Sequence, residues 1–149
     1  PAQIGAGMSV WTSTKQVPEQ AREWTKSILD TLGKEIEVDD EKYLDMSTAI
    51  NGSGPAYVFT FAEALIDAAV HIGLNRALAR DLALQTLWGS SKLLLQSDAH
   101  PAELRDRVTS PGGTTAEALL ELEQGGFRAT IMSAVAAAYE KSLAIGDGK

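Results

Sequence analysis

Residues 56–72 read AYVFTFAEALIDAAVHI, and this stretch decides the fold class. Only four polar side chains interrupt it, and they are Thr60, Glu63, Asp67 and His71. They recur every three or four positions, so they form one narrow stripe along a predicted helix. A helix that is apolar around the rest of its girth needs cover on several sides. A chain of 149 residues offers little of its own for this, so we expect a second copy of the chain to supply part of the cover.

The polar stripe has a second possible meaning. Glu63 and Asp67 are one helical turn apart and would also suit a pair of catalytic carboxylates. A solvated edge of the helix is the commoner meaning of such a stripe, and we adopt it. His71 and His100 are too far apart to form the i, i+4 pair of a metal site, so we expect no metal.

Helical patterns continue on both sides of this segment, from Asp39 nearly to the end of the chain. Asp40 is predicted to cap a helix that Asn51 and the residues after it break, and Asn75 is predicted to cap another. Gly125 and Gly126 separate the last two helices. The expected helices span residues 41–50, 56–72, 76–96, 101–108, 114–124 and 127–144.

The first 38 residues follow a different pattern. A strand is predicted near 8–11, a helix over 19–32 that Pro18 opens and Gly33 closes, and a second strand over 35–38. This is the strand–helix–strand order of an α/β sheet, and two short strands look like the end of a larger domain. We therefore expect residues 1–38 to end a truncated nucleotide-binding domain and residues 39–149 to form a helical domain.

Composition narrows the possible partners. The net charge of −7 disfavours nucleic acid, and the absence of cysteine excludes disulfides and thiol catalysis. No apolar run is long enough to cross a bilayer and no signal peptide is present, so we expect a cytoplasmic protein without membrane partners. The chain opens at Pro1 rather than at methionine, and we expect an upstream segment to be missing. The pair Gly5 and Gly7 is not a dinucleotide fingerprint, because the third glycine is absent.

A glycine-rich loop, TSPGGTT at residues 109–115, runs directly into a predicted helix. Thr114 and Glu117 have the spacing of a capping box, which places Thr115 in the first helical turn. Gly112 and Gly113 let the open backbone amides approach a ligand closely. Such amides at a helix N-terminus suit a carboxylate or a phosphate. A capped helix start without any ligand is the alternative on these local grounds.

Three motifs together resemble one enzyme family. They are NGSGPAY at residues 51–57, TSPGGTT at 109–115 and GGFR at 125–128, and they are similar in order and spacing to the C-terminal region of pyrroline-5-carboxylate reductases. The resemblance implies a mainly α fold: an all-helical dimerisation domain of the 6-phosphogluconate dehydrogenase C-terminal type, after the end of a Rossmann domain. It also implies reduction of 1-pyrroline-5-carboxylate to L-proline with NADPH or NADH, the last step of proline biosynthesis. The implied assembly is a homodimer, in many members within a ring of dimers.

The resemblance also implies roles for single residues. Thr115 would be the catalytic residue, bonded to the substrate's ring nitrogen. The substrate carboxylate would lie on the loop amides, so that the substrate-binding set is Ser110, Gly112, Gly113, Thr114 and Thr115, with Asp98 as an acidic residue near the site. Pro1 and Ser53 would belong to the cofactor site. Asn51 replaces a more usual serine, and we expect no consequence from that exchange.

Two alternatives remain at this stage. The family's glycine-rich phosphate loop is absent, so the chain alone is expected to be inactive, and it could instead be a stand-alone oligomerisation or carboxylate-binding module without redox activity. An upstream reading frame that encodes a strand followed by Gly-x-Gly-x-x-Gly would favour the enzyme. A different member of the hydroxyacid dehydrogenase group would share the helical domain, but the loop at 109–115 argues against it.

Overall fold

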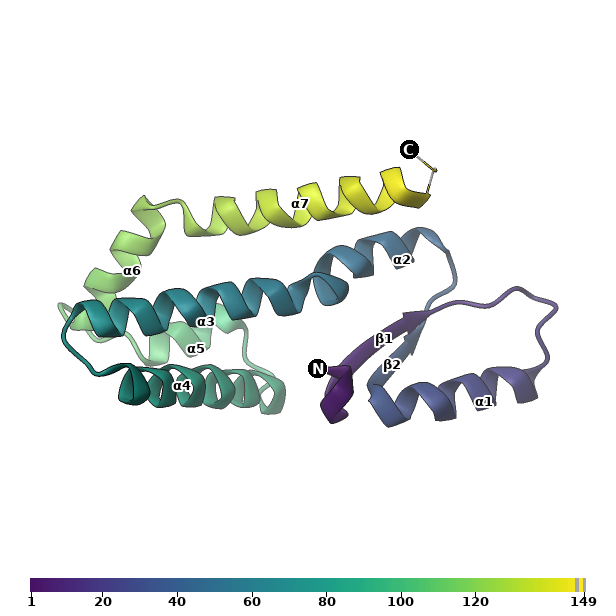
Figure 1. The fold of residues 1–149 in the computed structure, drawn as a ribbon, viewed down its shortest axis with the longest axis horizontal. Coiled ribbons are helices and arrows are strands. Elements are labelled where there is room, and N and C mark those ends of the chain that lie inside the picture. Colours follow the sequence, from purple (N-terminus) through teal and green to yellow (C-terminus); the bar gives the residue numbers. More distant parts are fainter. Residues whose placement is uncertain (147, 149) are drawn as a thin grey trace. The chain divides into compact units, whose positions relative to one another are not determined.

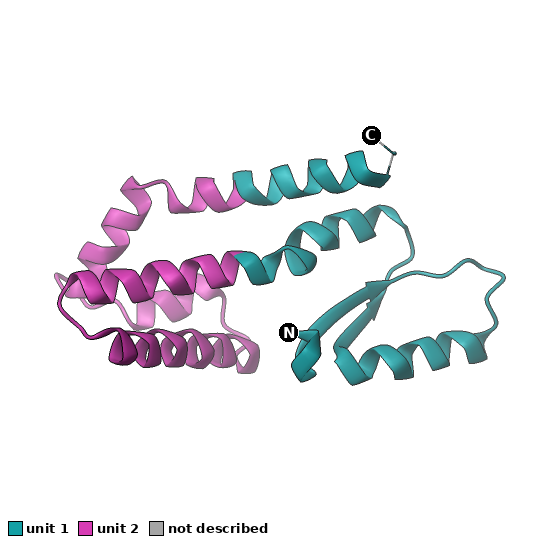
Figure 2. Cartoon of the chain, viewed as in Figure 1, with its two compact units in different colours: residues 1–56, 133–149 teal, residues 57–132 magenta. Residues whose placement is uncertain are grey.

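The computed structural model describes residues 1–146 and 148, and these form two compact units (Figures 1 and 2). Unit 1 comprises residues 1–56 and the described part of 133–149, and unit 2 comprises residues 57–132. The predicted fold class is confirmed, because the described chain is mainly helical with one two-stranded sheet. The units divide the chain at other places than the predicted domains, which stay a prediction.

Unit 1 contains the predicted strand–helix–strand. Strand β1 (Gly7–Trp11) pairs in parallel with β2 (Gly33–Glu37), and α1 (Glu19–Leu29) joins them. The predicted boundaries of the helix were too wide. Pro18 is extended and lies at the cap position before α1. The helix ends at Leu29, and a 3₁₀ turn over Asp30–Leu32 leads to Gly33, whose φ of 142° opens β2.

Ion pairs fix α1 to the second strand. The Arg22 guanidinium lies 2.6 Å from Glu37 Oε1, and this hydrogen bond lowers the pKa of the Glu37 carboxyl. Lys26 Nζ lies 3.3 Å from Glu35 Oε1, and Trp11 Nε1 donates to Glu35 Oε2 at 2.6 Å. Exposed ion pairs contribute little individually. The hydrogen bond from Trp11 to Glu35 and the covalent connection between the elements therefore hold α1, β1 and β2 together.

The segment after the sheet departs from the prediction in two ways. Helix α2 (Lys42–Ser47) has Glu41 at its cap position, and the Asp40 carboxylate accepts from Lys42 N–H at 2.9 Å instead of capping a longer helix. The predicted break over residues 51–55 takes the form of a π-helical turn and a bend rather than a loop. The chain continues as a π-helical turn, η3 (Thr48–Gly52), and after a bend at Ser53 enters α3 (Gly54–His71).

The remaining helices match the predicted ones closely. They are α4 (Arg76–Gln96), α5 (Pro101–Arg107), α6 (Thr114–Gln124) and α7 (Phe127–Gly146), in the order shown in Figure 1. Helix α7 begins in unit 2 and ends in unit 1, where Ser142 Oγ donates to Asp45 Oδ1 of α2 at 2.6 Å. No helix within the described residues has the length and apolarity to span a bilayer.

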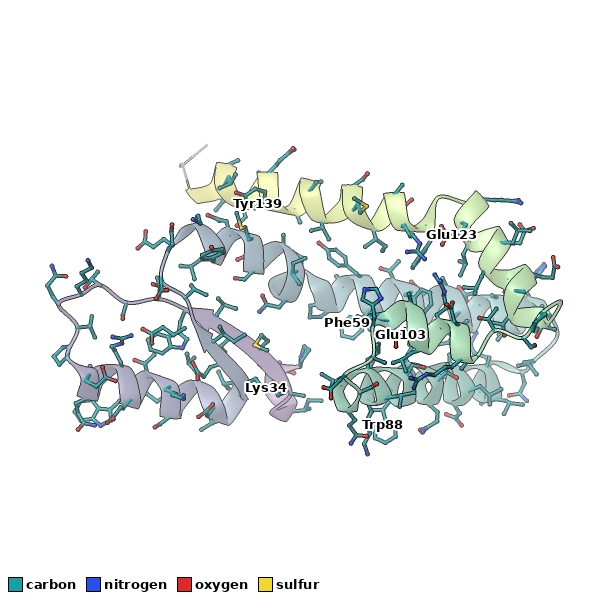
Figure 3. The ribbon with its side chains drawn as sticks, turned by 180° about the vertical axis from the view of Figure 1, so that it is seen from behind. Lys34, Phe59, Trp88, Glu103, Glu123 and Tyr139 are labelled. Carbon is teal, nitrogen blue, oxygen red and sulfur yellow. The ribbon has the colours of Figure 1, made fainter. Side chains whose placement is uncertain are left out.

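The single chain buries very little. Among the residues that the structure describes, the buried hydrophobic ones are four alanines, Ala49, Ala62, Ala79 and Ala83. Phe59 on α3 is 66% exposed and Trp88 on α4 is 59% exposed (Figure 3). The chain exposes 11214 Å², about half as much again as the roughly 7,300 Å² expected of a compact monomer of this mass. The four residues of the polar stripe are exposed as predicted, but so is most of the apolar surface beside them.

The N-terminus of α4 allows a test of one local contribution to stability. The Asn75 side chain accepts from Leu78 N–H at 2.9 Å, as the cap position predicts. We expect Asn75→Ala to lower the free energy of unfolding by about 1 kcal/mol, because a helix N–H loses its partner. Urea unfolding followed by circular dichroism at one protein concentration would measure this. A loss below about 0.3 kcal/mol would contradict the capping role.

Candidate functional site

The loop before α6 is a tight turn. Gly113 N–H donates to the Ser110 carbonyl at 3.0 Å, and Gly112 between them has a φ of 68°. Pro111 at the second position and a glycine with positive φ at the third are the residues that a type II turn requires. A side chain on Gly113 would collide with Ser110 Oγ, so the serine hydroxyl lies against this glycine. The turn therefore depends on both glycines.

The predicted capping box is wrong by one residue. Gly113, in extended conformation, occupies the cap position, and no side chain caps α6. The Gly113 carbonyl accepts from Ala116 N–H at 3.0 Å and from Glu117 N–H at 3.4 Å. The first helical hydrogen bonds are therefore accepted by the carbonyl of Gly113 and not by that of Thr114. Thr114 is the first residue of the helix and does not occupy its cap position. The side chain of Thr114 therefore does not cap α6, and the Glu117 side chain makes no capping hydrogen bond either.

The first turn of α6 keeps open donors. The N–H groups of Thr114 and Thr115 have no hydrogen-bond partner among the residues that the structure describes. The hydroxyl of Thr115 is equally unused in this part of the chain, and the residue is half-buried, whereas Thr114 is exposed. Open amides at the positive end of a helix attract an anion, and a hydroxyl beside them adds a directed hydrogen bond. This arrangement suits a small molecule that has a carboxylate with a second polar group beside it.

The structure brings most of the predicted substrate-binding residues together. Ser110, Gly112, Gly113, Thr114 and Thr115 form this one loop and helix start. Asp98 lies apart in sequence, exposed in the connection between α4 and α5, and makes no hydrogen bond or ion pair within the described residues. In the same part of the chain, no three His, Asp or Glu side chains cluster as metal ligands would.

The two predicted cofactor residues lie in unit 1. The Pro1 carbonyl accepts from Ile4 and Ala6 N–H at 3.1 Å, which closes the turn before β1. Ser53 directly precedes the 18-residue helix α3, and its hydroxyl makes no hydrogen bond within the described residues. The space where a Gly54 side chain would stand is empty.

The glycines of the sheet are packed closely and leave no room for a ligand. A side chain on Gly7 would approach the Leu32 carbonyl to 2.9 Å, and one on Gly33 would collide with Gly7. These glycines therefore serve the close packing of the sheet against its own turns. This agrees with rejecting Gly5 and Gly7 as a phosphate-binding fingerprint.

Two hollows of unit 2 lie outside the predicted site. A groove of about 330 Å³ between α3 and α4 is lined by Leu65, Ile72, Leu82, Thr86 and four alanines. Its apolar lining suits a helix rather than a carboxylate substrate. A hollow of about 350 Å³ between α5 and α6 includes Thr109 and Ala116, which flank the loop, but none of the predicted substrate-binding residues.

Comparisons with known proteins agree on one family. The family model for pyrroline-5-carboxylate reductase dimerisation matches residues 41–145. Pyrroline-5-carboxylate reductase of Synechocystis is 44% identical over 98% of this chain and 54% of its own length, and pyrroline-5-carboxylate reductase 3 of Xenopus laevis is 44% identical over 98% and 53%. The chain thus spans about half the length of the curated relatives it matches.

Solved structures give the same result for the fold. The pyrroline carboxylate reductase of Plasmodium falciparum, with NADP bound, matches with a TM-score of 0.91 at 43% identity, over 96% of this chain and 54% of that one. The 1-pyrroline-5-carboxylate reductase of Streptococcus pyogenes matches with a TM-score of 0.91 at 35% identity, over 95% and 54%.

The turn before α6 yields a prediction that separates its two kinds of residue. Gly112→Ala should lower the free energy of unfolding by about 1–2 kcal/mol, because alanine resists a φ of 68°. Thr114→Ala should change it by less than about 0.5 kcal/mol, because Thr114 is exposed and caps nothing. Urea unfolding of both variants measures the difference. A larger loss of unfolding free energy for Thr114→Ala than for Gly112→Ala would show that Thr114 caps the helix after all.

Proposed function

The chain belongs to the pyrroline-5-carboxylate reductase family, and we propose that it forms the C-terminal part of an enzyme that reduces 1-pyrroline-5-carboxylate to L-proline with NADPH or NADH. The observation that carries the proposal is the start of α6, where the open N–H groups of Thr114 and Thr115 lie beside the unused Thr115 hydroxyl. The substrate has a carboxylate on the carbon next to its ring nitrogen, which suits that pair of donors.

In this proposal the residues of the chain bind and orient the substrate. The loop from Ser110 to Thr114 holds the carboxylate through its open amides, of which the N–H of Thr114 is one, and the Thr115 oxygen accepts a hydrogen bond from the protonated ring nitrogen. The imine carbon is the better hydride acceptor when the ring nitrogen is protonated, so the bond to Thr115 favours the reactive form as well as its orientation. The nicotinamide cofactor supplies the hydride. Asp98 is proposed to act near this site.

The cofactor site is proposed to lie largely in the rest of a nucleotide-binding domain, of which residues 1–38 would be the end and to which residues 39–149 would attach. Pro1 and Ser53 are its proposed contributors from this chain. The NADP bound to the Plasmodium falciparum relative supports a nicotinamide cofactor. The chain alone is expected neither to hold the dinucleotide nor to turn over substrate. A cytoplasmic location is part of the proposal.

We further propose that the functional unit is a homodimer, with a ring of dimers as its possible higher assembly. The support is the total accessible surface, which is several thousand Å² larger than a compact monomer of this mass would show, together with the many large hydrophobic side chains exposed on it. That excess is in the range that obligate dimers bury. The groove between α3 and α4 offers a place for a helix of the second copy.

The dimer can be tested on the chain itself. Light scattering at micromolar concentration should give twice the mass of one chain, and Leu82→Glu should lower that mass because a charge would enter the apolar groove. Gln85→Glu, which adds the same charge on α4 outside the groove lining, is the matched control and should stay dimeric. A well-folded monomer of the unmodified chain would contradict the proposal.

The catalytic assignment is tested by Thr115→Ala in the full-length reductase. Loss of a hydrogen bond to a desolvated ring nitrogen should cost ~1–3 kcal/mol of transition-state stabilisation. The value of kcat/KM should therefore fall about ten- to a hundredfold. Stability should change by less than about 0.5 kcal/mol, since the Thr115 hydroxyl bonds no described group.

Thr114→Ala is the control for this experiment. Its side chain is exposed and it would keep its backbone N–H, so turnover should stay within about threefold of the unmodified enzyme. If Thr114→Ala abolished turnover and Thr115→Ala preserved it, the catalytic residue would be Thr114. An unmodified enzyme that binds substrate but reduces nothing would favour the carboxylate-binding module instead.

A further inference from the structure

Asn51 makes a hydrogen bond over a long stretch of sequence. Its Nδ2 donates to the Met8 carbonyl of β1 at 2.7 Å, across a separation of 43 residues. Both residues belong to unit 1. The exchange of the family's usual serine for Asn51 was expected to have no consequence. The structure gives the side chain amide a defined partner that a shorter side chain would not reach from the same backbone position.

The Met8 carbonyl lies on the edge of β1 that faces away from β2. Val38 N–H donates to the Trp11 carbonyl at 2.8 Å, so the carbonyl of Trp11 faces β2. Carbonyls along a parallel strand alternate between its two edges. The carbonyls of Ser9 and Gly7 therefore also face β2, and the carbonyls of Met8 and Val10 face the opposite edge. No ladder bond to β2 competes for the Met8 carbonyl, and Asn51 is free to hold it.

The π-helical turn explains how Asn51 comes to face the strand. Ser53 N–H donates to the Thr48 carbonyl at 2.8 Å, five residues back, which inserts one residue into the helical path. One extra residue rotates the following side chains by about 100° relative to a regular α-helix. A π turn is less favourable than an α turn and occurs often at functional sites. The bond to Met8 gives this turn a compensating contact.

The hydrogen bond joins the two segments that carry the proposed cofactor residues. Met8 follows the turn closed by Pro1, and Asn51 precedes Ser53 by two residues. We propose that Asn51 is a positioning residue: by holding the π-helical turn against the open edge of β1 it sets the position of Ser53 relative to the turn closed by Pro1, and so sets the affinity of the reductase for its nicotinamide cofactor. The proposal rests on the proposed function and adds a residue to it.

The test compares three variants of the full-length reductase. Asn51→Ala removes the donor, and Asn51→Asp keeps the size of the side chain but places a carboxylate oxygen against the Met8 carbonyl. Asn75→Ala is the matched control, because it removes an asparagine hydrogen bond of 2.9 Å in unit 2. For each variant the measurements are melting temperature, the Kd of NADPH from its fluorescence, and the separate KM values for cofactor and imine.

Asn51→Ala should raise both the Kd and the KM of NADPH about threefold to tenfold, as the loss of one partly exposed hydrogen bond predicts. Asn51→Asp should raise them further. The KM of the imine and kcat should stay within about twofold, since the loop at α6 is unchanged. Asn75→Ala should lower the melting temperature without changing the cofactor values.

Two results would overturn the positioning role. One is an unchanged Kd of NADPH in both Asn51 variants. The other is a fall in melting temperature with equal changes in every kinetic parameter, as for a residue that only stabilises the fold. If the unmodified protein binds NADPH but reduces no imine, the proposed function fails while the Kd values still decide the role of Asn51. If it binds no NADPH, both proposals fail.

Discussion

Too little of the apolar surface is buried within one chain, and this constraint governs the rest of the structure. Four alanines make up the buried hydrophobic residues among those that the structure describes, while large side chains such as Phe59 and Trp88 face solvent. At roughly 25 cal/mol per Å² of apolar surface, leaving such residues uncovered forfeits the main favourable term in folding. The helices therefore have to be stabilised by another surface, and their length and small residues at close approaches suit other helices.

The predictions from the sequence that succeeded are those that depend on local signals. Long helices with a strong pattern, such as α3 and α4, were placed nearly to the residue, because their limits are marked by local signals like Asn75. The parallel strand pair was also predictable from its strand–helix–strand order. What the sequence pattern does not specify is that large apolar side chains of α3 and α4, such as Phe59 and Trp88, stay exposed in one chain.

The predictions that failed depend on geometry that a local pattern does not specify. A capping box at Thr114 and Glu117 satisfied the spacing rule, yet the turn at Ser110 to Gly113 places the cap of α6 at Gly113, one residue earlier. Asn51 was taken as part of a break because glycines and a proline follow it. The chain keeps helical dihedrals there through a π turn, whose stabilising contact with Met8 is 43 residues away. Long-range contacts of this kind leave no mark within a short window of sequence.

The shifted helix start also changes what the loop can do chemically. Had Thr114 been the cap, its side-chain oxygen would have accepted a hydrogen bond from a helix N–H, and that N–H would have been closed to a ligand. With Gly113 at the cap, the turn itself supplies the carbonyl that closes the first helical bonds, and no side chain is consumed in doing so. Both the amides and the Thr115 hydroxyl then remain available for a ligand. With a glycine at the cap, no threonine side chain is needed to stabilise the start of the helix. Substitutions of Thr114 and Thr115 are therefore expected to have small effects on stability and to differ in their effects on turnover.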